Sequence, residues 1–390
     1  MNLIELPFMK SKISLRDFPS AKARREFLEK ELEINLENIA KFTFTEEQVK
    51  GRNIENLIGA THIPLGIAGP LKILNTKYQI LNTYIPLATT EGALVASISR
   101  GCKAISGASG ACVEVETVGI TRGPVFKTAG IAHGQKIKQW IQTHIPLISQ
   151  ITQKTSSHLK FLKADFAIVG RNLFVRFYFD STDAMGMNMA TIATQAIVKL
   201  IEQKTQAKCI TLAGNFDIDK KPSWLNFISG RGKKVWAEVI LPKKVVKEVL
   251  KTTPAKIVEV VNTKTHLGSI MSGSLGFNSH FANIIAAIFA ATGQDLAHVV
   301  EGSLGVTTAE ALENGELYFS IYLPDLIVGT VGGGTHLPTQ QEALKIMAVS
   351  DVLEYCRAVG AAVLAGELSL IASLAEGTLA KAHQKLGRKK

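Results

Sequence analysis

The chain has 390 residues, of which 46% are hydrophobic and 20% are charged, as is typical of a globular protein with two or three structural units. Its net charge of +11 suits a polyanionic partner. The basic residues are spread among several helical segments, and no RNA-binding aromatic signature or helix-turn-helix pattern stands out. Most of this charge is therefore expected on the solvated surface.

Three further observations bear on location and on metal content. No apolar stretch reaches membrane-spanning length without a charged or polar break, and the nearest candidate, residues 361–375, contains Glu367 and two serines. The first 13 residues lack the basic start and apolar core of a signal peptide. The four cysteines form no CxxC pair. We therefore expect a cytoplasmic protein with no membrane span, no disulfide framework and no metal site.

The first third of the chain predicts a small helical unit followed by strands. Residues 1–56 are polar and helix-prone. The expected elements are helices at residues 21–33 and from residues 43–47 onward, strands within residues 63–86, and a helix over residues 91–105. Thr89 and Thr90 are expected to cap the last of these helices, which places Glu91 in its first turn, where the helix dipole favours an acidic group.

Residues 122–211 predict a compact α+β unit. Its expected elements are a helix at residues 135–143, strands at residues 165–169 and 172–179, a helix at residues 189–203, and a strand at residues 209–212. The turn Gly170-Arg171 joins the two middle strands into a hairpin. This order indicates a split βαβ, or ferredoxin-like, unit that is inserted within a larger domain, which resumes near Pro222.

The remainder alternates between helices and strands. The expected elements are a strand at residues 234–241, a helix or helix pair at 243–261, a helix at 274–291, a hairpin within 312–323, a helical region at 340–374 and a basic tail helix at 377–385. The hairpin is the clearest of these, because Asn314-Gly315 is a strong turn signal.

A short motif between the second hairpin strand and the following helix suggests a binding site. The hexapeptide Asp183-Ala-Met-Gly-Met-Asn188 offers an Asp that can cap the helix, a Gly in the first turn and an Asn beside it. Free N–H groups and the positive dipole end of a helix suit a phosphate or a ribose. A Rossmann motif is not found, since the glycines at 329–334 have the wrong spacing; one interpretation of them is close backbone packing.

Four other segments accompany the hexapeptide in the order of one family. They are Glu55-Asn-Leu-Ile-Gly59 with Pro64-Leu-Gly-Ile-Ala-Gly-Pro70, Thr89-Thr-Glu-Gly92 with Arg100-Gly-Cys-Lys103, Asp219-Lys-Lys-Pro222, and Gly329-Thr-Val-Gly-Gly-Gly-Thr335. This set resembles 3-hydroxy-3-methylglutaryl-coenzyme A (HMG-CoA) reductase over most of the chain. Met187, and the Asp-Lys-Lys-Pro followed by Gly230-Arg-Gly-Lys233, resemble the eukaryotic and archaeal class, in its soluble catalytic portion.

The resemblance implies an α+β fold with three parts. They are a small N-terminal helical unit (1–56), a large helix-rich substrate and coenzyme A domain (57–121 and 222–390), and an inserted small ferredoxin-like NAD(P)-binding domain (122–211). Residues 212–221 would be the connecting catalytic loop. The hexapeptide would then hold the nucleotide, through Asp183, Ala184, Met185, Gly186, Met187 and Asn188. NADPH is the expected cofactor, and NADH is possible.

Reduction of a thioester to an alcohol needs a cation for the negative oxygen, acids for the protons and a group that protonates the departing thiolate. The resemblance assigns Lys220 as the cation, Glu91 and Asp295 as the acids, and His383 as the group that protonates the thiolate. We expect Lys220, Glu91 and Asp295 to form one coupled network. Substrate binding is assigned to Arg122, Asp219, Lys221, Lys264, Asn283 and His280. Coenzyme A contacts are assigned to Ser97 and Arg100.

The chain departs from the family pattern at three points. Ala213 stands where a serine hydroxyl is common, the Gly276-Phe277 segment is one Gly shorter, and Ser157 stands where an Arg can meet the 2′-phosphate of NADPH.

The expected activity is the reduction of HMG-CoA to mevalonate by a homodimer or a dimer-based oligomer that binds no nucleic acid. Two alternatives stay open at this point: a different nicotinamide-dependent hydroxyacyl dehydrogenase, and a basic nucleic-acid-binding protein.

Overall fold

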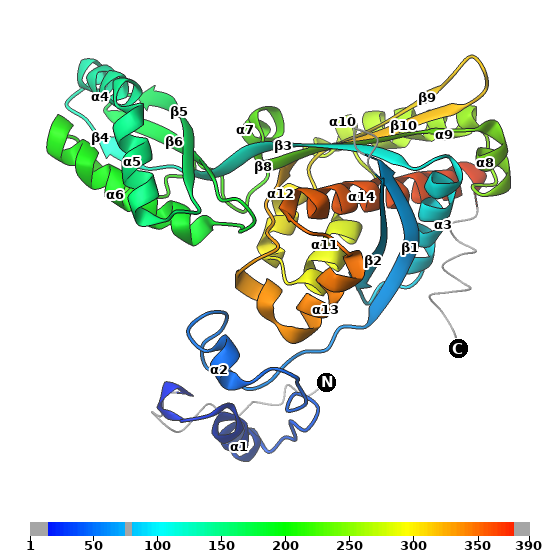
Figure 1. Ribbon diagram of the computed structural model, residues 1–390, viewed down its shortest axis with the longest axis horizontal. Coiled ribbons are helices and arrows are strands. Elements are labelled where there is room, and N and C mark those ends of the chain that lie inside the picture. The colour runs from blue at the N-terminus through cyan, green and yellow to red at the C-terminus, as the bar shows by residue number, and fades with distance from the viewer. Residues whose placement is uncertain (1–14, 75–79, 378–390) are drawn as a thin grey trace, which may run out of the picture.

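The computed structural model describes residues 15–74 and 80–377, and within them the chain forms two lobes and a small N-terminal unit (Figure 1). The long strand β3 (Ala111–Arg122) runs from the large lobe into the small lobe. The protein therefore has a mixed helix and sheet fold, as the sequence predicts. The tail helix expected at 377–385 lies, apart from Gly377, outside the described residues.

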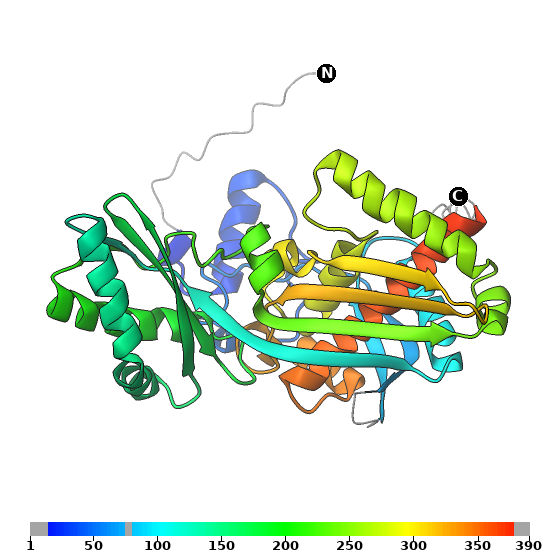
Figure 2. The same ribbon diagram turned by 90° about the horizontal axis from the view of Figure 1, so that it is seen from above.

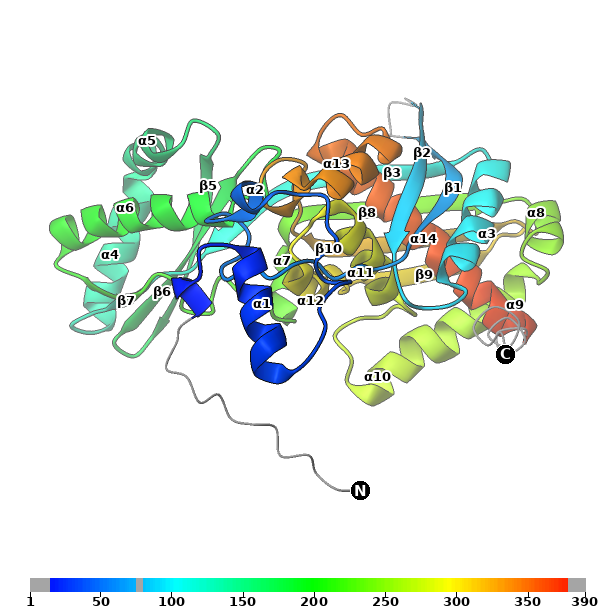
Figure 3. The same cartoon turned by 90° about the horizontal axis from the view of Figure 1, so that it is seen from below.

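The N-terminal unit consists of α1 (Ala21–Leu32) and α2 (Glu46–Val49), which begin where the sequence predicts. Ser20 Oγ caps α1 by accepting the N–H of Ala23, and Thr45 forms a capping box at α2. Seen from below, this unit lies across the large lobe close to α13 (Figure 3). Its small core joins Leu337, and this contact anchors the unit to the C-terminal third of the chain.

The large lobe is built on a mixed sheet, in which β1 pairs in parallel with β3 and the other pairings are antiparallel, and most of its helices lie below the sheet in Figure 1. The sheet strands are β1 (Leu65–Leu74), β2 (Ile80–Ala88), β3, β8 (Arg231–Leu241), β9 (Val306–Ala311) and β10 (Leu317–Leu326). Its helices are α3 (Leu94–Gly107), α7 (Trp224–Ser229), α8 (Lys243–Glu248), α9 (Pro254–Val260), α10 (Ser269–Ser272), α11 (Phe281–Thr292), α12 (Val299–Gly302), α13 (Pro338–Met347) and α14 (Val352–Glu376), with a π-helix at Val261–Gly268. Figure 2 shows β3, β8, β10 and β9 side by side with α14 crossing behind them.

Helix α14 is long and apolar enough to cross a membrane by length and composition. Of its most apolar window, 78% is buried inside the protein, where it packs on α3, β8 and β3. Burial on all sides is the position of a central core helix. We therefore interpret α14 as the element around which the large lobe packs.

The small lobe is a four-stranded antiparallel sheet of order β7-β4-β6-β5 with helices packed against it. Its elements are β4 (Val125–Lys127), α4 (Ile131–Thr143), α5 (Ile145–Thr155), β5 (Lys160–Val169), β6 (Asn172–Asp180), α6 (Met187–Thr205) and β7 (Lys208–Thr211). The predicted hairpin at Gly170 is confirmed, since Val169 pairs with Asn172. Helix α5 was not predicted.

Strand β3 joins the two sheets. It pairs with β8 as far as Gly119 and then with β6 over Ile120 to Arg122. The change occurs at a bulge where Gly119 has a φ of 96° and where a Cβ atom would lie 2.8 Å from the carbonyl oxygen of Phe179. Only glycine fits this bend without strain. The bend places Arg122 at the junction of the lobes.

Two helices of the large lobe begin later than expected. Helix α3 begins at Leu94, because Ala93 has a left-handed φ of 75°, and Glu91 therefore lies in the loop before the helix, where its N–H is held by Thr89 Oγ1 at 3.0 Å. Helix α11 begins only at Phe281, because the buried Glu367 carboxylate accepts the preceding backbone N–H groups and holds them in a turn.

The other predictions for the large lobe are confirmed with adjusted boundaries. The hairpin at Asn314-Gly315 joins β9 to β10, with Leu317 paired to Ala311. The predicted helix pair at 243–261 is present as α8 and α9. The region predicted to be helical at 340–374 is divided into α13 and α14, because Ala348 is left-handed (φ 54°) and the Asp351 carboxylate caps a new helix.

Candidate active site

Residues 212–221 form an irregular loop between β7 and α7. Three of its non-glycine residues have left-handed backbone angles: Asn215 (φ 61°), Ile218 (φ 52°) and Lys220 (φ 57°). Such angles are strained for residues that carry a side chain, and they persist only where the surroundings enforce them. Thr121 Oγ1 donates to the carbonyl oxygen of Asp217 at 2.7 Å, and the Lys220 N–H donates to the Glu301 carboxylate at 3.0 Å. The loop is thus a strained element held by buried neighbours.

The side chain of Lys220 forms an ion pair with Asp295, which follows α11. The Nζ and Oδ2 atoms are 2.7 Å apart, and both side chains are partly exposed. Burial raises the pKa of the Asp295 carboxyl, but hydrogen bonds from Lys220 and from the Ala297 amide outweigh burial, so the net pKa is below its usual value. Asp295 is therefore ionised at neutral pH and holds the ammonium group of Lys220 in place.

A hollow of about 550 Å³ lies on the small-lobe side of this ion pair. We call it the glycine-lined hollow. It is lined by hexapeptide residues 184–188, by Gly293 to Asp295, by the glycine-rich residues 329–334, and by Arg52 and Asn53 of the N-terminal unit. The glycine-rich segment packs directly on the hexapeptide, since a Cβ atom on Gly329 would lie 2.4 Å from the Met185 nitrogen. Close packing is thus confirmed for Gly329 and also for Gly334, but not for Gly332 and Gly333, where a Cβ atom would meet nothing within 4 Å. All four glycines line the cavity.

The role expected for Asp183 as the cap of α6 is wrong. The N-cap of α6 is Gly186, which makes no side-chain hydrogen bond. The Asp183 carboxylate instead accepts the N–H of Val352, the first residue of α14, at 3.0 Å, while the Asp183 carbonyl accepts the N–H of Thr330 at 2.8 Å. Within the described part of the chain, the first amides of α6 therefore have no side-chain cap from the N-cap residue.

A second hollow, of about 820 Å³, lies beyond the 212–221 loop. We call it the serine-rich hollow, because Ser269, Ser272, Ser274, Ser279 and Ser303 line it. Lys264, His280, Asn283 and Pro222 also line it, so three predicted substrate residues share one cavity. Lys264 comes from the π-helix, an element that is frequent at functional sites.

Glu91 lies with this second group rather than with the ion pair. Asn283 Nδ2 donates to Glu91 Oε1 at 3.3 Å. Within the described parts of this single chain, no hydrogen bond or ion pair joins Glu91 to Lys220 or to Asp295. The expected three-residue network is therefore formed only in part here, as the Lys220–Asp295 pair.

The predicted binding residues near the loop have partners inside the protein. The Arg122 guanidinium is 3.3 Å from the Asp217 carboxylate and donates to Thr191 Oγ1 at 2.8 Å. Asp219 accepts from Arg231 at 2.9 Å, and Lys221 Nζ donates to the Asp219 carbonyl at 3.1 Å. The loop is thus surrounded by compensated charges.

Ser97 and Arg100 lie apart from both hollows and tie two helices together. Ser97 Oγ donates to Ser369 Oγ at 2.9 Å, and Arg100 Nε donates to the same oxygen at 3.0 Å. These bonds join α3 to α14 and give both residues a structural role in the isolated chain. His383 falls outside the described residues.

The comparisons with known proteins agree with this arrangement of motifs. The family model described as hydroxymethylglutaryl-coenzyme A reductase matches residues 20–388. The chain belongs to the HMG-CoA reductase family. It is 50% identical to the reductase of Methanocaldococcus jannaschii over 94% of this chain and 92% of that protein, and 46% identical to the reductase of Pyrococcus abyssi over 94% of this chain and 92% of that protein.

Solved structures show the same fold at lower identity. The class II HMG-CoA reductase from Streptococcus pneumoniae, solved bound to NADPH in open conformations, has a TM-score of 0.69 and 18% identity, and the match covers 91% of this chain and 97% of that chain. The predicted resemblance to HMG-CoA reductase is thereby confirmed, and both relatives compared in sequence are archaeal. HMG-CoA reductases are oxidoreductases that make mevalonate for isoprenoid synthesis.

Several residues around the candidate site were not predicted. They are Arg52 and Asn53 in the glycine-lined hollow, and Arg231, His298 and Glu301 beneath the loop. Two local signals were present in the sequence. Arg231 lies in the Gly-Arg-Gly-Lys string, and His298 and Glu301 follow Asp295 at a spacing of i, i+3, which places two side chains on one face of a helical turn.

Proposed function

We propose that this chain reduces (S)-HMG-CoA to (R)-mevalonate and coenzyme A with two molecules of NADPH, at the Lys220–Asp295 ion pair. The observation that carries this proposal is that Asp295 of the pair lines one hollow, while Pro222, which follows the Lys220 loop, lines the other. One hollow presents backbone groups and glycines, and the other presents Lys264, His280 and Asn283. A cation between a nucleotide and a thioester is what the reaction requires.

Lys220 is proposed as the group that stabilises the oxyanion. A bound reduced nicotinamide supplies the hydride for each of the two reductions. During each reduction, negative charge develops on the substrate oxygen, and the Lys220 ammonium meets it without having to reorganise, because Asp295 already holds Nζ at 2.7 Å. The lowered pKa of Asp295 keeps its carboxylate ionised and Lys220 fixed.

Glu91 and His383 are proposed as the proton-handling groups. Asn283 holds the Glu91 carboxylate at 3.3 Å, and this bond orients Glu91 over the serine-rich hollow that contains Asn283. We propose that Glu91 meets Lys220 of a second subunit, so that the complete site forms in a homodimer or a dimer-based oligomer. The proposed role of His383, protonation of the departing coenzyme A thiolate, rests on the family resemblance.

The serine-rich hollow and its rim are proposed to hold the substrate. Arg122 would bind the free carboxylate of the glutaryl chain through two hydrogen bonds. Its guanidinium, which forms an ion pair with Asp217, would then contact both carboxylates. Asp219, Lys221, Lys264, His280 and Asn283 would complete the polar lining. Ser97 and Arg100 are proposed for coenzyme A on the family resemblance alone.

The residues of the glycine-lined hollow fit a nicotinamide dinucleotide. The free first-turn amides of α6 suit a phosphate, and side chains are absent from Gly332 and Gly333, where a Cβ atom would meet open space. Arg52 brings a positive charge to the same hollow. We propose NADPH as the preferred cofactor for that reason, although Ser157 replaces the usual arginine and NADH stays possible.

The proposed division of labour follows the two lobes. Residues 122–211 would bind the nucleotide, residues 57–121 and 222–390 would bind the substrate and coenzyme A, and residues 212–221 would connect them. We propose a soluble, cytoplasmic enzyme that needs no metal and binds neither membrane nor nucleic acid.

Product analysis tests the proposal. The purified chain is incubated with (S)-HMG-CoA and either NADPH or NADH, and the products are identified by mass spectrometry. Mevalonate and free coenzyme A are expected, with a lower KM for NADPH than for NADH. A product that still carries the thioester would favour the alternative hydroxyacyl dehydrogenase. Salt-sensitive retention on DNA with no reduction of HMG-CoA would favour the nucleic-acid-binding alternative.

A further inference from the structure

The backbone of Lys220 is held by one buried carboxylate. Lys220 has a φ of 57°, and Ile218 two positions before it has a φ of 52°. Each such residue costs roughly 1–3 kcal/mol of backbone strain, so the loop needs a fixed anchor to keep this form. Glu301 Oε1 supplies it by accepting the Lys220 N–H at 3.0 Å. The direction in which the Lys220 side chain leaves the loop therefore depends on Glu301.

Glu301 is itself fixed by two cationic or proton-donating groups. Its side chain is fully buried, as are those of Arg231 and His298. Arg231 donates to Glu301 Oε1 at 2.5 Å and to the Asp219 carboxylate at 2.9 Å, and His298 Nδ1 lies 3.2 Å from the same Glu301 oxygen. A buried carboxylate is stable only with such partners, so Glu301 has little freedom to move.

The second nitrogen of His298 faces the other half of the ion pair. His298 Nε2 lies 3.8 Å from Asp295 Oδ2, is buried and has no hydrogen-bond partner. Asp295 Oδ2 is the oxygen that contacts Lys220 Nζ. The contacts thus form a closed ring from the Lys220 N–H through Glu301, His298 and Asp295 back to Lys220 Nζ.

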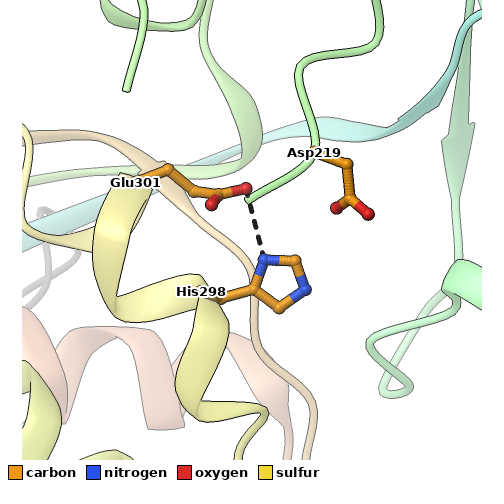
Figure 4. A group of neighbouring side chains, drawn as sticks. All are labelled: Asp219, His298 and Glu301. Carbon is orange, nitrogen blue, oxygen red and sulfur yellow. Dashed lines mark hydrogen bonds and ion pairs between the residues drawn. The ribbon is translucent and has the colours of Figure 1, made fainter. Parts of the chain in front are cut away.

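The same cluster has the donor atoms of a metal site. Figure 4 shows Asp219, His298 and Glu301 with their carboxylates and imidazole converging. The guanidinium of Arg231, however, already bonds to both Asp219 and Glu301. A divalent ion between these carboxylates would lie against a fixed positive charge, and the cation of this cluster is therefore Arg231.

We infer that Glu301 and His298 are positioning residues of the active site. Glu301 fixes the backbone of Lys220, and His298 orients the carboxylate of Asp295, so that the two partners meet in one geometry. This inference rests on the proposed function of the Lys220–Asp295 pair. Neither Glu301 nor His298 lines the glycine-lined or the serine-rich hollow, so both act through neighbouring residues.

The first test replaces Glu301 with Leu, which has no oxygen to accept the Lys220 N–H, and uses Asp325→Asn as the control. Asp325 is buried like Glu301 and lies near Arg231, but within the described residues no hydrogen bond or ion pair joins its carboxylate to the 212–221 loop. For a reacting group displaced by about 1 Å, a loss on the order of 10²-fold is known. Glu301→Leu is expected to lower kcat for HMG-CoA by ~10–100-fold with KM changed by less than ~3-fold, whereas Asp325→Asn stays within ~3-fold of wild type in both.

The second test separates the two nitrogens of His298. In His298→Asn the amide can still donate to Glu301, but nothing faces Asp295, whereas in His298→Gln the longer side chain places its amide near the position of Nε2. If His298 orients Asp295, His298→Gln should retain more kcat than His298→Asn. Equal values, or the reverse order, would overturn the Asp295 part of the inference.

The outcomes distinguish this inference from the proposed function. If wild-type enzyme turns over HMG-CoA and Lys220→Met does not, while Glu301→Leu equals Asp325→Asn in kcat, only the positioning role fails. If Lys220→Met is as active as wild type, the proposed function of the ion pair fails first. Thermal unfolding of each variant shows whether it is folded, and the His298 pair tests the same ring if Glu301→Leu does not fold.

Discussion

Replacing Lys220 with Met removes the ammonium group and keeps a side chain of similar reach. The Lys220–Asp295 distance of 2.7 Å indicates a direct charge-assisted hydrogen bond, but the two side chains are 41% and 33% exposed. Such a pair contributes at most about 1 kcal/mol to stability, so the melting temperature should fall by only a few degrees. Loss of a preorganised oxyanion donor costs ~10²–10³-fold in kcat, which is about 2.7–4 kcal/mol.

Turnover is measured from the absorbance of NADPH, with HMG-CoA varied, for wild type, Lys220→Met, Arg122→Ala and Lys247→Met. Lys247 is an exposed lysine of α8 that lines neither hollow, and its variant should match wild type. Lys220→Met should lose kcat, and its KM should change less than that of Arg122→Ala. Near-normal turnover by a folded Lys220→Met protein would refute the assignment.

Three other variants test separate parts of the account. His383→Gln should severely slow the reduction of HMG-CoA and largely spare the reduction of supplied mevaldehyde; equal losses on both would indicate a structural role. Mixed Glu91→Gln and Lys220→Met chains should regain some activity if these groups meet between subunits, and a fully active monomer in sedimentation would contradict that arrangement. Burial raises the pKa of Asp325 to about 8, from 3.8, although Arg231 lowers it in part. Between these two pKa values the folded chain keeps a proton that the unfolded chain releases. The free energy of unfolding should therefore fall by on the order of 1 kcal/mol per pH unit as the pH rises through this range. In denaturant titrations, Asp325→Asn should make the free energy of unfolding less dependent on pH.

The elements that the sequence predicted well have local signals. The hairpins at Gly170-Arg171 and Asn314-Gly315 follow from turn residues between two apolar runs, and both are present. The helix expected at Glu91 was displaced to Leu94 because Ala93 adopts a left-handed angle that no propensity scale anticipates. Helix α11 was displaced by Glu367, a residue more than 80 positions away. These two boundaries failed because one depends on a backbone angle and the other on a distant contact, and neither leaves a local signal in the sequence.

The same distinction applies to the site. Motif order identified Lys220 and Asp295, and the structure pairs them. The sequence did not assign a role to Glu301, because its function depends on a contact with the Lys220 backbone across 81 positions. Likewise, the glycines at 329–334 were interpreted as a family motif and as a mark of close packing, and their place in the wall of a cavity became clear only from the fold.

The stoichiometry of the reaction tests the central claim most directly. NADPH oxidation and the release of free coenzyme A thiol are measured in the same sample, with limiting HMG-CoA and with the Lys220→Met protein as the blank. A four-electron reduction at the Lys220–Asp295 site predicts two NADPH oxidised for each thiol released. One NADPH oxidised with no thiol released would contradict it and would identify a one-hydride dehydrogenase instead.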